Sequence, residues 1–598
     1  MSRLFDSDSD HLVRATRTLA SWYPNAVEPT AELHQSLAFL ESDLRADTVV
    51  SAGYVLAPIA TVLAFCALVF AVPSLPVAAA APAAAGLGLG STHFVHRLPV
   101  AAATLHRTRA LGDAPGLVAR AALRLRLDAT PERAAVFAAR TGEGPLARSL
   151  AAHAERTRGG PSAGLDGFAS EWRSWFPALE RSTSLLLAAV DAPPEERDDA
   201  LDRALATVLE GARTEMAEFA NDVRGPASGI YAFGVLLPLA LVGVLPAARA
   251  GGVSVPAAAF VTIYDVVLPA GLVFAGAWLL LRRPIALAPA RVTTAHPDVP
   301  SGPAAGIAAA LVGFALGAGL GSLVASWATP VSAVGLALGA GLAVHYRPMA
   351  AVRGDVTAVE SGLADATAVV GRRVGAGESV ETAIQSAADA TTGRTSEVFD
   401  AAAGVQRRLR VGVRRAFLGP HGALEHVPSP RGRATASLLA VAAREGRPAG
   451  PTLVTLADHL TELRRVEADA RRELAAITGT LGHTAALFGP LVGGATVAMA
   501  TQMAASGVES TRRTVGASPA DGASLAGSVA PGATTLDPSL LGTAVGVYVL
   551  ALASILTVVA TGLDRGLDRS LVGYRVGLAL ASATVAYLTA FVGASMLF

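Results

Sequence analysis

The sequence predicts an all-helical, multi-pass membrane protein built as a parallel tandem repeat, with two helical-bundle domains on the cytoplasmic side. Three observations predict this class: several long apolar blocks, sparse charge, and similar segments that recur roughly 250 residues apart. Charged residues make up only 16% of the 598 residues, and the mean hydropathy is +0.46. A soluble protein usually carries about 25% charged residues, so the composition argues against an ordinary soluble enzyme.

Nine apolar blocks are long enough to cross a membrane. A hydrocarbon core about 30 Å thick needs roughly 20 apolar residues in a helix. The second and sixth blocks are weaker, because Ala and Gly replace much of the Leu and Ile. The first block follows 48 mostly polar residues, which is not the pattern of a cleavable signal peptide. The nine blocks are residues 49–72, 75–95, 228–247, 255–281, 304–325, 328–346, 481–505, 540–563 and 574–597.

The placement of arginine predicts the orientation in the plasma membrane. With a cytoplasmic N-terminus, only Arg249, Arg512 and Arg513 lie outside, which leaves 45 of the 48 arginines inside (48 − 3). Many of these inner arginines flank the ends of apolar blocks, as the positive-inside rule requires. The C-terminus is then external. The expected order is a cytoplasmic segment 1–48, a transmembrane pair 49–95, a cytoplasmic helical domain 96–226, transmembrane pairs 227–281 and 304–346, a second cytoplasmic helical domain 347–480, a pair 481–563 with a flexible external loop 506–539, and a final helix 574–597.

An internal repeat relates the two halves of the chain. Thr130 and Ser379 each place a hydroxyl at a predicted helix start, with Glu two positions later, and they lie 249 residues apart (379 − 130). Ser184 and Ser437 begin similar Leu/Ala-rich runs that are 253 residues apart (437 − 184). Four membrane crossings separate the copies, so both copies face the same way. This pattern indicates a parallel repeat, related by an axis along the membrane normal.

Several kinds of chemistry are excluded by residue counts. The chain has no lysine, so a Walker A phosphate loop and a Schiff-base enzyme are both ruled out. Cys66 is the only cysteine, which excludes an intrachain disulfide and a multi-cysteine zinc site. The formal net charge is zero, and no HExxH motif occurs, so neither nucleic-acid binding nor a zinc protease is supported. We expect no catalytic residue, cofactor or metal.

Two segments carry a resemblance to a known family. VGAGESVETAIQSAA (374–388), then SLLAVAAREGRPAGPTLVTLADHL (437–460) and a membrane pair, resemble the F domain of type II secretion and type IV pilus systems. The corresponding segments of the first copy, 127–139 and 184–201, lack the matching glycines. The archaeal pilus and archaellum platform proteins are the most similar members, since they have several membrane helices and two cytoplasmic helical domains.

The resemblance implies a non-enzymatic platform protein in the membrane. Such a protein couples a cytosolic hexameric secretion ATPase to the insertion of pilin-like or archaellin subunits from the bilayer. The resemblance also implies contact with membrane lipids and assembly as a homodimer. It leaves open which pilus, archaellum or secretion filament is served.

Two surface features are candidate ATPase-docking sites. The stretch 406–415 is expected to be helical, with its arginines spread around the helix. A solvated face, or attraction to anionic lipid at about 1 kcal/mol per residue, is the alternative. The turn at Gly446 and Arg447 is expected between two helices, either as an exposed docking tip or as a simple connection. The five arginines of the stretch are Arg407, Arg408, Arg410, Arg414 and Arg415.

Asp265 is a candidate intramembrane polar contact. It lies about ten residues into the block 255–281, where an acid costs roughly 2.5–3.5 kcal/mol and must face protein or water. It either bonds a hydroxyl such as that of Tyr264 or Thr262, or touches an incoming pilin subunit. Glycines four residues apart in three blocks predict close helix packing. They are Gly86 and Gly90, Gly313, Gly317 and Gly321, and Gly335 and Gly339.

A secondary transporter is the alternative function, because transporters are also often built from repeats. That function predicts ionisable residues near mid-membrane and broken helices at corresponding positions of both copies. Asp265 has no acidic counterpart in the block 540–563.

Overall fold

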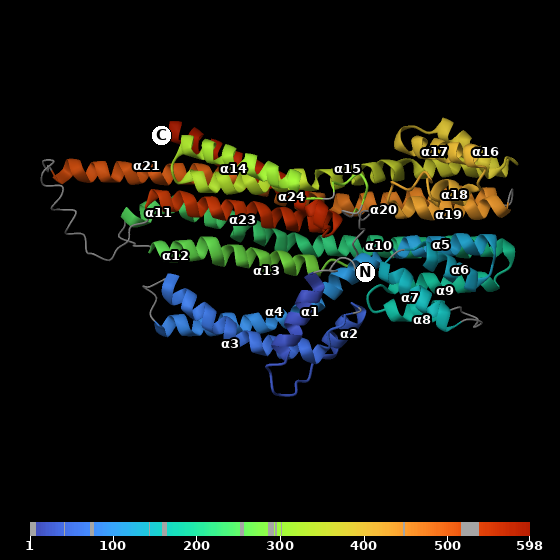
Figure 1. Cartoon of the computed structure of the whole chain (residues 1–598), viewed down its shortest axis with the longest axis horizontal. Coiled ribbons are helices and arrows are strands. Elements are labelled where there is room, and N and C mark those ends of the chain that lie inside the picture. The colour runs from blue at the N-terminus through green and yellow to red at the C-terminus, as the bar shows by residue number, and fades with distance from the viewer. Residues whose placement is uncertain are drawn as a thin grey trace. The chain divides into compact units, whose positions relative to one another are not determined.

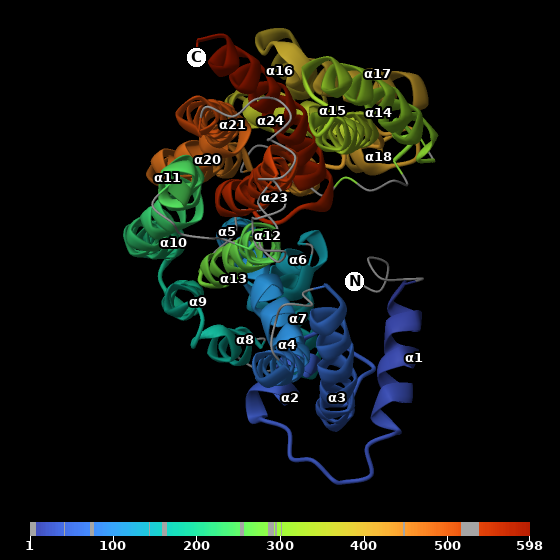
Figure 2. The same cartoon turned by 90° about the vertical axis from the view of Figure 1, so that its left-hand side faces the viewer.

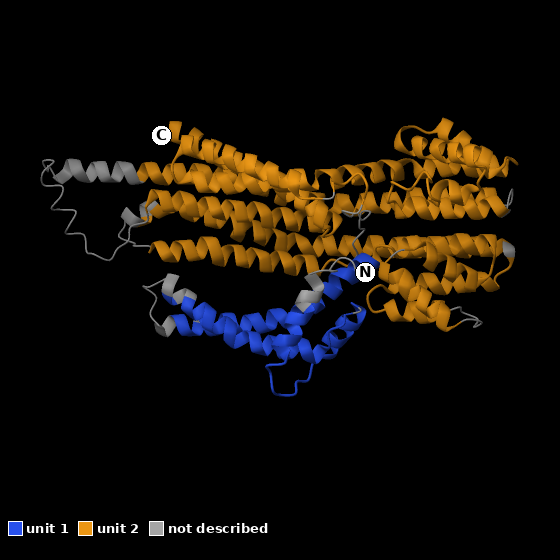
Figure 3. Cartoon of the chain, viewed as in Figure 1, with its two compact units in different colours: residues 1–110 blue, residues 111–598 orange. Residues whose placement is uncertain are grey.

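The computed structural model is 87% helical and, in the part of the chain that it describes, contains no strand. It divides into two compact units, residues 1–110 and 111–598 (Figure 3). The residues described are 8–40, 42–71, 77–142, 144–157, 164–250, 256–284, 292, 296–300, 302–445, 449–515 and 537–597.

The described residues of the first unit form four helices. Two of them, α3 and α4, pack against each other through polar contacts. On α4, Thr92 donates a hydrogen bond to the Gly53 carbonyl of α3 (3.1 Å), and His96 contacts the Val50 carbonyl of α3 (3.2 Å). Gly88 permits this approach, since a Cβ there would overlap Thr61. The helices are α1 (Asp8–Ala20), α2 (Ala31–Phe39), α3 (Ala46–Ala71) and α4 (Val77–Leu111).

Within the first unit, Gly86 and Gly90 do not make the close helix contact that their spacing predicts. No atom lies within 4 Å of a Cβ built at either position, whereas the intervening Gly88 faces α3. Successive helical positions differ by about 100°, so a stripe shifted by two residues points to the opposite side of the helix.

The second unit contains two polar helical bundles and a set of long apolar helices. In Figure 1 the polar bundles lie at one end, and Figure 2 looks along the axes of the apolar helices at the other. The first polar bundle comprises α5 (Ala114–Leu127), α6 (Pro131–Thr141), α7 (Gly144–Arg156), α8 (Leu165–Trp172), α9 (Pro177–Asp191) and α10 (Pro194–Tyr231). The second comprises the C-terminal half of α15 (Ala328–Gly375), α16 (Val380–Ala390), α17 (Gly393–Leu409), α18 (Val413–Leu418), α19 (Pro430–Glu445) and α20 (Ala449–His483).

The remaining helices of this unit are predominantly apolar. They are α11 (Leu237–Ala250), α12 (Ala257–Val261), α13 (Leu268–Leu281), α14 (Ala304–Val324), α21 (Gly489–Val515), α23 (Pro538–Arg565) and α24 (Arg569–Leu597). The expected external loop 506–539 falls largely outside the described residues, and α21 continues to Val515.

Within the described residues, eight helices are long and apolar enough to cross a membrane, as in a multi-pass membrane protein. They correspond to eight of the nine expected blocks. The block 75–95 lies in α4 and is not among them; part of it falls outside the described residues. The eight are Ala46–Cys66, Glu195–Leu245, Ala257–Leu281, Ala304–Val324, Ala328–Gly375, Ala449–Met503, Pro538–Arg565 and Arg569–Leu597.

Three of these helices contain a π-helical segment that ends two residues before a proline. Proline has no N–H, and its ring clashes with the carbonyl four residues earlier, so a wider turn accommodates it. In the first segment the Leu237 N–H donates to the carbonyl of Ala232, five residues back. The segments are η2 (Ala232–Leu236) before Pro238, η3 (Thr262–Val267) before Pro269, and η4 (Thr484–Phe488) before Pro490.

The helices α14 and α15 approach closely along a glycine stripe. A Cβ at Gly313, Gly317 or Gly321 would overlap the backbone or the side chain of α15. The hydroxyl of Ser332 uses this approach to donate a hydrogen bond to the Gly317 carbonyl at 2.6 Å. Small residues thus hold two apolar helices together where no hydrophobic driving force exists between them.

A buried ion pair fixes the turn between α23 and α24 against α15. Arg353, whose side chain is 5% exposed, donates to Asp568 at 2.8 Å. Asp568 also caps α24, since its Oδ1 accepts from the N–H groups of Ser570 and Leu571 at 3.1 Å each. Burial raises the pKa of Asp568, but hydrogen bonds from the Ser570 hydroxyl and the Leu571 N–H, together with the Arg353 guanidinium, hold this pKa below its ordinary value.

The first prediction concerns the glycine stripe. Gly317→Ala should lower the free energy of unfolding by about 1–3 kcal/mol, because the new methyl group collides with the Ser332 carbonyl. Gly319→Ala, two residues away with nothing within 4 Å, is the matched control and should be neutral or slightly stabilising. Denaturant titration in detergent measures both, and equal losses for the two variants would contradict the packing described.

The second prediction concerns the buried ion pair. Asp568→Asn keeps a cap on α24 but leaves Arg353 buried opposite a neutral group, so unfolding should become easier by about 3 kcal/mol. Asp537→Asn, at the exposed cap of α23, is the control and should change stability by less than about 0.5 kcal/mol. Thermal unfolding of both variants in one detergent provides the comparison. A loss at Asp568 no larger than that at Asp537 would show that the pair contributes nothing.

Candidate functional site: an arginine-lined cleft between the polar bundles

The arginine stretch 406–415 is not a single helix, contrary to the expectation. The helix α17 ends at Leu409, Arg410 adopts a left-handed conformation (φ 51°), and α18 begins at Val413. This turn lets Val413 and Phe417 enter the core of the second bundle, and that burial offsets the strained backbone at Arg410. All five arginines remain exposed, but they are divided between the end of α17, the turn after it and α18.

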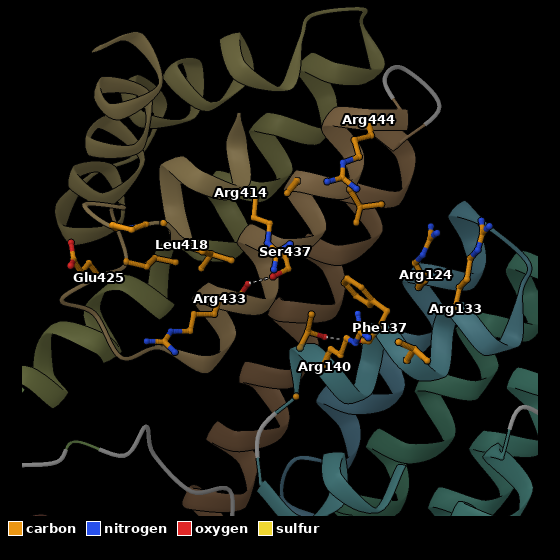
Figure 4. A pocket seen from close by; sticks show the side chains of 18 of the residues that line it. Arg124, Arg133, Phe137, Arg140, Arg414, Leu418, Glu425, Arg433, Ser437 and Arg444 are labelled. Carbon is orange, nitrogen blue, oxygen red and sulfur yellow. Dashed lines mark hydrogen bonds between the residues drawn. The ribbon is translucent and has the colours of Figure 1, made fainter. Parts of the chain in front are cut away.

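One of the five, Arg414, lines a cleft between the two polar bundles. The cleft has a volume of about 1080 Å³. Its walls come from α5 and α6 of the first bundle and from α18 and α19 of the second (Figure 4). Six arginines line it, against two glutamates, Glu132 and Glu425. The arginines are Arg124, Arg133, Arg140, Arg414, Arg433 and Arg444.

Two of the cleft arginines share one carboxylate. Asp128 accepts from Arg124 at 3.1 Å and from Arg133 at 2.6 Å, both through Oδ2. The hydroxyl of Thr130 donates to its other oxygen. Thr130 above all, with Arg133 and Arg124, holds the pKa of Asp128 below its ordinary value. Asp128 therefore stays ionised throughout the physiological range and fixes these two guanidiniums at the rim.

Three other cleft arginines have a positive charge that no neighbouring carboxylate of the described residues neutralises. Arg140, Arg414 and Arg444 make no hydrogen bond or ion pair with any residue of the described ranges. Arg140 comes from the first bundle, while Arg414 and Arg444 come from the second, and all three surround one cavity (Figure 4). Arginine presents five donors in a planar fork that fits carboxylates. The cleft is therefore suited to an anionic group that contacts both bundles.

The floor of the cleft also has an apolar part. Val136 and Phe137 on α6 face Leu418, Leu424 and Val441 across the cavity. Val136 is an exposed apolar side chain, at 38%. An acidic segment with apolar side chains would match both parts of this surface, because the ring of arginines would pair with its carboxylates.

Contacts beside the cleft hold its two walls together. Arg126 of α5 pairs with Asp202 of α10 and donates to Thr455 of α20 at 2.8 Å. Arg213 of α10 donates to Glu462 of α20 at 2.7 Å. The first bundle thus contacts the second mainly through α20, the helix that continues into an apolar segment.

The other sequence-predicted site residues lie elsewhere. Asp265 lies in η3, far along the chain from the cleft residues, and its Oδ1 is buried without a hydrogen-bond partner among the described residues. Tyr264 is not its partner, because the Tyr264 hydroxyl donates to the Pro238 carbonyl at 2.6 Å. Gly446 and Arg447 lie outside the described residues. Of the other cleft arginines, Arg133 and Arg444 lie in segments that carry the family resemblance, but the sequence singles out none of them as a site residue.

No family model, curated protein or solved structure matches this chain. Among the residues that the structure describes, no three or more His, Cys, Asp or Glu side chains are grouped to hold a metal ion.

Proposed function

We propose that the chain is a membrane platform protein of a type IV pilus-like or type II secretion-like assembly machine. In this role it transmits the motion of a cytosolic hexameric ATPase to pilin-like or archaellin subunits that leave the bilayer, and it catalyses no reaction itself. The observation that carries the proposal is the continuity of helices between the polar bundles and the apolar segments.

Three long helical rods provide this continuity. The helical stretches Glu195–Leu245, Ala328–Gly375 and Ala449–Met503 contain 51, 48 and 55 residues. At 1.5 Å per residue each is about 70–80 Å long, far more than a membrane needs. Each begins or ends in a polar bundle, so a force on a bundle moves an apolar helix without an intervening flexible loop.

A parallel repeat is part of the proposal and has one further support. The prolines that follow η2 and η4 are Pro238 and Pro490, which are 252 residues apart (490 − 238). This spacing agrees with the offsets of 249 and 253 seen for the helix starts. Both rods thus widen at corresponding positions as they enter the apolar layer. Both polar bundles would then face the cytoplasm, with the N-terminus inside and the C-terminus outside.

The arginine-lined cleft is the proposed contact for the ATPase. It draws on both bundles, so a partner that enters it would act on both rods at once. Its uncompensated positive charge favours an acidic surface on the partner. Of the five exposed arginines that the sequence alone singles out, Arg414 of α18 lines this shared cavity and the other four do not.

Secondary transport is the second candidate. It is favoured by the unpartnered oxygen of Asp265 and by π-helical segments in three apolar helices. Transporters place substrate sites at interrupted helices near mid-membrane. Saturable solute uptake into proteoliposomes, abolished by Asp265→Asn, would support this function instead of the platform.

The third prediction tests mechanical transmission. Two glycines inserted after Ile477 of α20 should soften the rod and shift its register, and filament output should fall by more than about tenfold. Membrane insertion should persist, as measured by fractionation. The control inserts the same two glycines after Thr392, in the exposed turn between α16 and α17. Normal output from the Ile477 insertion would contradict transmission through this helix.

The fourth prediction tests the docking surface. A triple variant, Arg140→Gln, Arg414→Gln and Arg444→Gln, should weaken binding of the secretion ATPase about tenfold or more, in a salt-dependent way. Arg407→Gln, Arg408→Gln and Arg410→Gln together remove the same charge outside the cleft and should change binding by less than about twofold. Titration with the purified ATPase measures both. The opposite ranking would move the docking site to the end of α17.

A further inference from the structure

A second group of arginines lies where the apolar helices meet the polar bundles. Asp564, at the end of α23, contacts Arg565 at 3.3 Å and both terminal nitrogens of Arg575 at 3.3 and 3.4 Å. All these contacts fall on one carboxylate oxygen, Oδ2. Arg471 of α20 is close enough to interact electrostatically with Arg565 and Asp564. Two guanidiniums therefore contact one carboxylate, and a third lies nearby on α20, which packs against α23; the net charge of the group is +2 (3 − 1).

In the described part of the chain, three acids close to these arginines already have guanidinium partners, and one of them, Glu467 at one turn before Arg471, contacts Arg431. Asp568, four residues beyond Asp564, is committed to Arg353 and to the cap of α24. Asp469, on the same helix as Arg471, contacts Arg213 and Arg472. Guanidiniums held together by too few carboxylates have a favourable site for a further anion between them.

The group lies at the level of the membrane interface. Arg283, at the end of α13, donates to the Gly562 carbonyl at 2.6 Å, which places the end of α13 beside Asp564. At that same end of α13 the guanidinium of Arg282 stacks over Trp278, 4.0 Å from the ring centroid. Tryptophan and arginine at helix ends mark the headgroup region of a bilayer.

The arginines of the group are open to the surroundings. The side chains of Arg565 and Arg575 are 39% and 33% exposed, and Arg471 is also exposed. Arg575 lies six residues beyond Arg569, so it sits about 9 Å farther along α24 in the direction of the apolar layer. Its guanidinium is therefore at headgroup depth, and its donors that do not contact Asp564 are free to bind a ligand.

We propose that Arg471, Arg565 and Arg575 form a binding site for the phosphate of an anionic phospholipid. Basic pockets between membrane helices recognise phosphate headgroups in this way, and the fork of arginine binds two phosphate oxygens at once. Asp564 orients the arginines and leaves them a positive charge. A lipid bound here bridges α20, α23 and α24, and so joins one of the long rods to the two C-terminal helices.

The fifth prediction tests this site on the full chain in detergent, by native mass spectrometry with phosphatidylglycerol and phosphatidylcholine. The wild-type chain should retain phosphatidylglycerol with about tenfold preference. The triple variant Arg471→Gln, Arg565→Gln and Arg575→Gln should lose that preference. The control Arg347→Gln, Arg472→Gln and Arg569→Gln removes equal charge from exposed positions outside the group and should retain it.

A single substitution at an exposed arginine provides a second test in case the triple variant does not fold. Arg471→Gln should weaken phosphatidylglycerol binding about fivefold and leave the melting temperature in phosphatidylcholine unchanged. Inorganic phosphate at millimolar concentration serves as the free-anion probe and should displace little lipid. Three results would each overturn the proposal. The first is an equal loss of preference in the control, and the second is unchanged binding in the triple variant and in Arg471→Gln. The third is full displacement of the lipid by phosphate.

Discussion

The backbone of the apolar helices must satisfy its own hydrogen bonds, because hydrocarbon supplies no partner. Pro238 breaks this rule locally, since it has no N–H to donate to the Gly234 carbonyl four residues earlier. The hydroxyl of Tyr548, from α23, donates to that carbonyl instead. Tyr264 donates to the carbonyl of Pro238 itself, and the two tyrosine rings meet edge to face. Side chains from two other helices thus repair the widened turn, and the rod passes through it without a break.

This repair explains how polar bundles and apolar segments share single helices. A rod that unwound at its proline would leave carbonyls exposed to lipid and would decouple its two ends. The structure keeps all three long helices continuous and then ties them laterally. The Ser332 hydroxyl links α15 to α14, while Arg353 links α15 to the turn before α24. The Ser332 contact lies within the apolar part of α15, while the Arg353 ion pair lies where this helix passes into its polar part.

The apolar blocks were predictable because a membrane span depends on local composition alone. The ends of the helices were not. The block 328–346 continues to Gly375, since nothing in the sequence terminates a helix at a membrane surface and Pro348 is tolerated within it. The converse error occurs at Arg410, where burial of Val413 and Phe417 overrides the local preference for helix. The sequence also did not predict that Gly88, and not Gly86 or Gly90, would pack against α3. Residue spacing alone does not reveal which face of a helix contacts its neighbour.

The two arginine groups could not be predicted from the sequence, because tertiary structure brings their residues together. Arg140 and Arg444 are about 300 residues apart, and a net charge of zero gives no sign of local excess. In both arginine groups one carboxylate, Asp128 or Asp564, contacts more than one guanidinium. Such a carboxylate orients the arginines but neutralises only one of them. Arginine suits this arrangement better than lysine, because part of its fork can hold the carboxylate while the remaining N–H groups face a ligand. A chain without lysine can therefore create anion-binding surfaces with no overall positive charge.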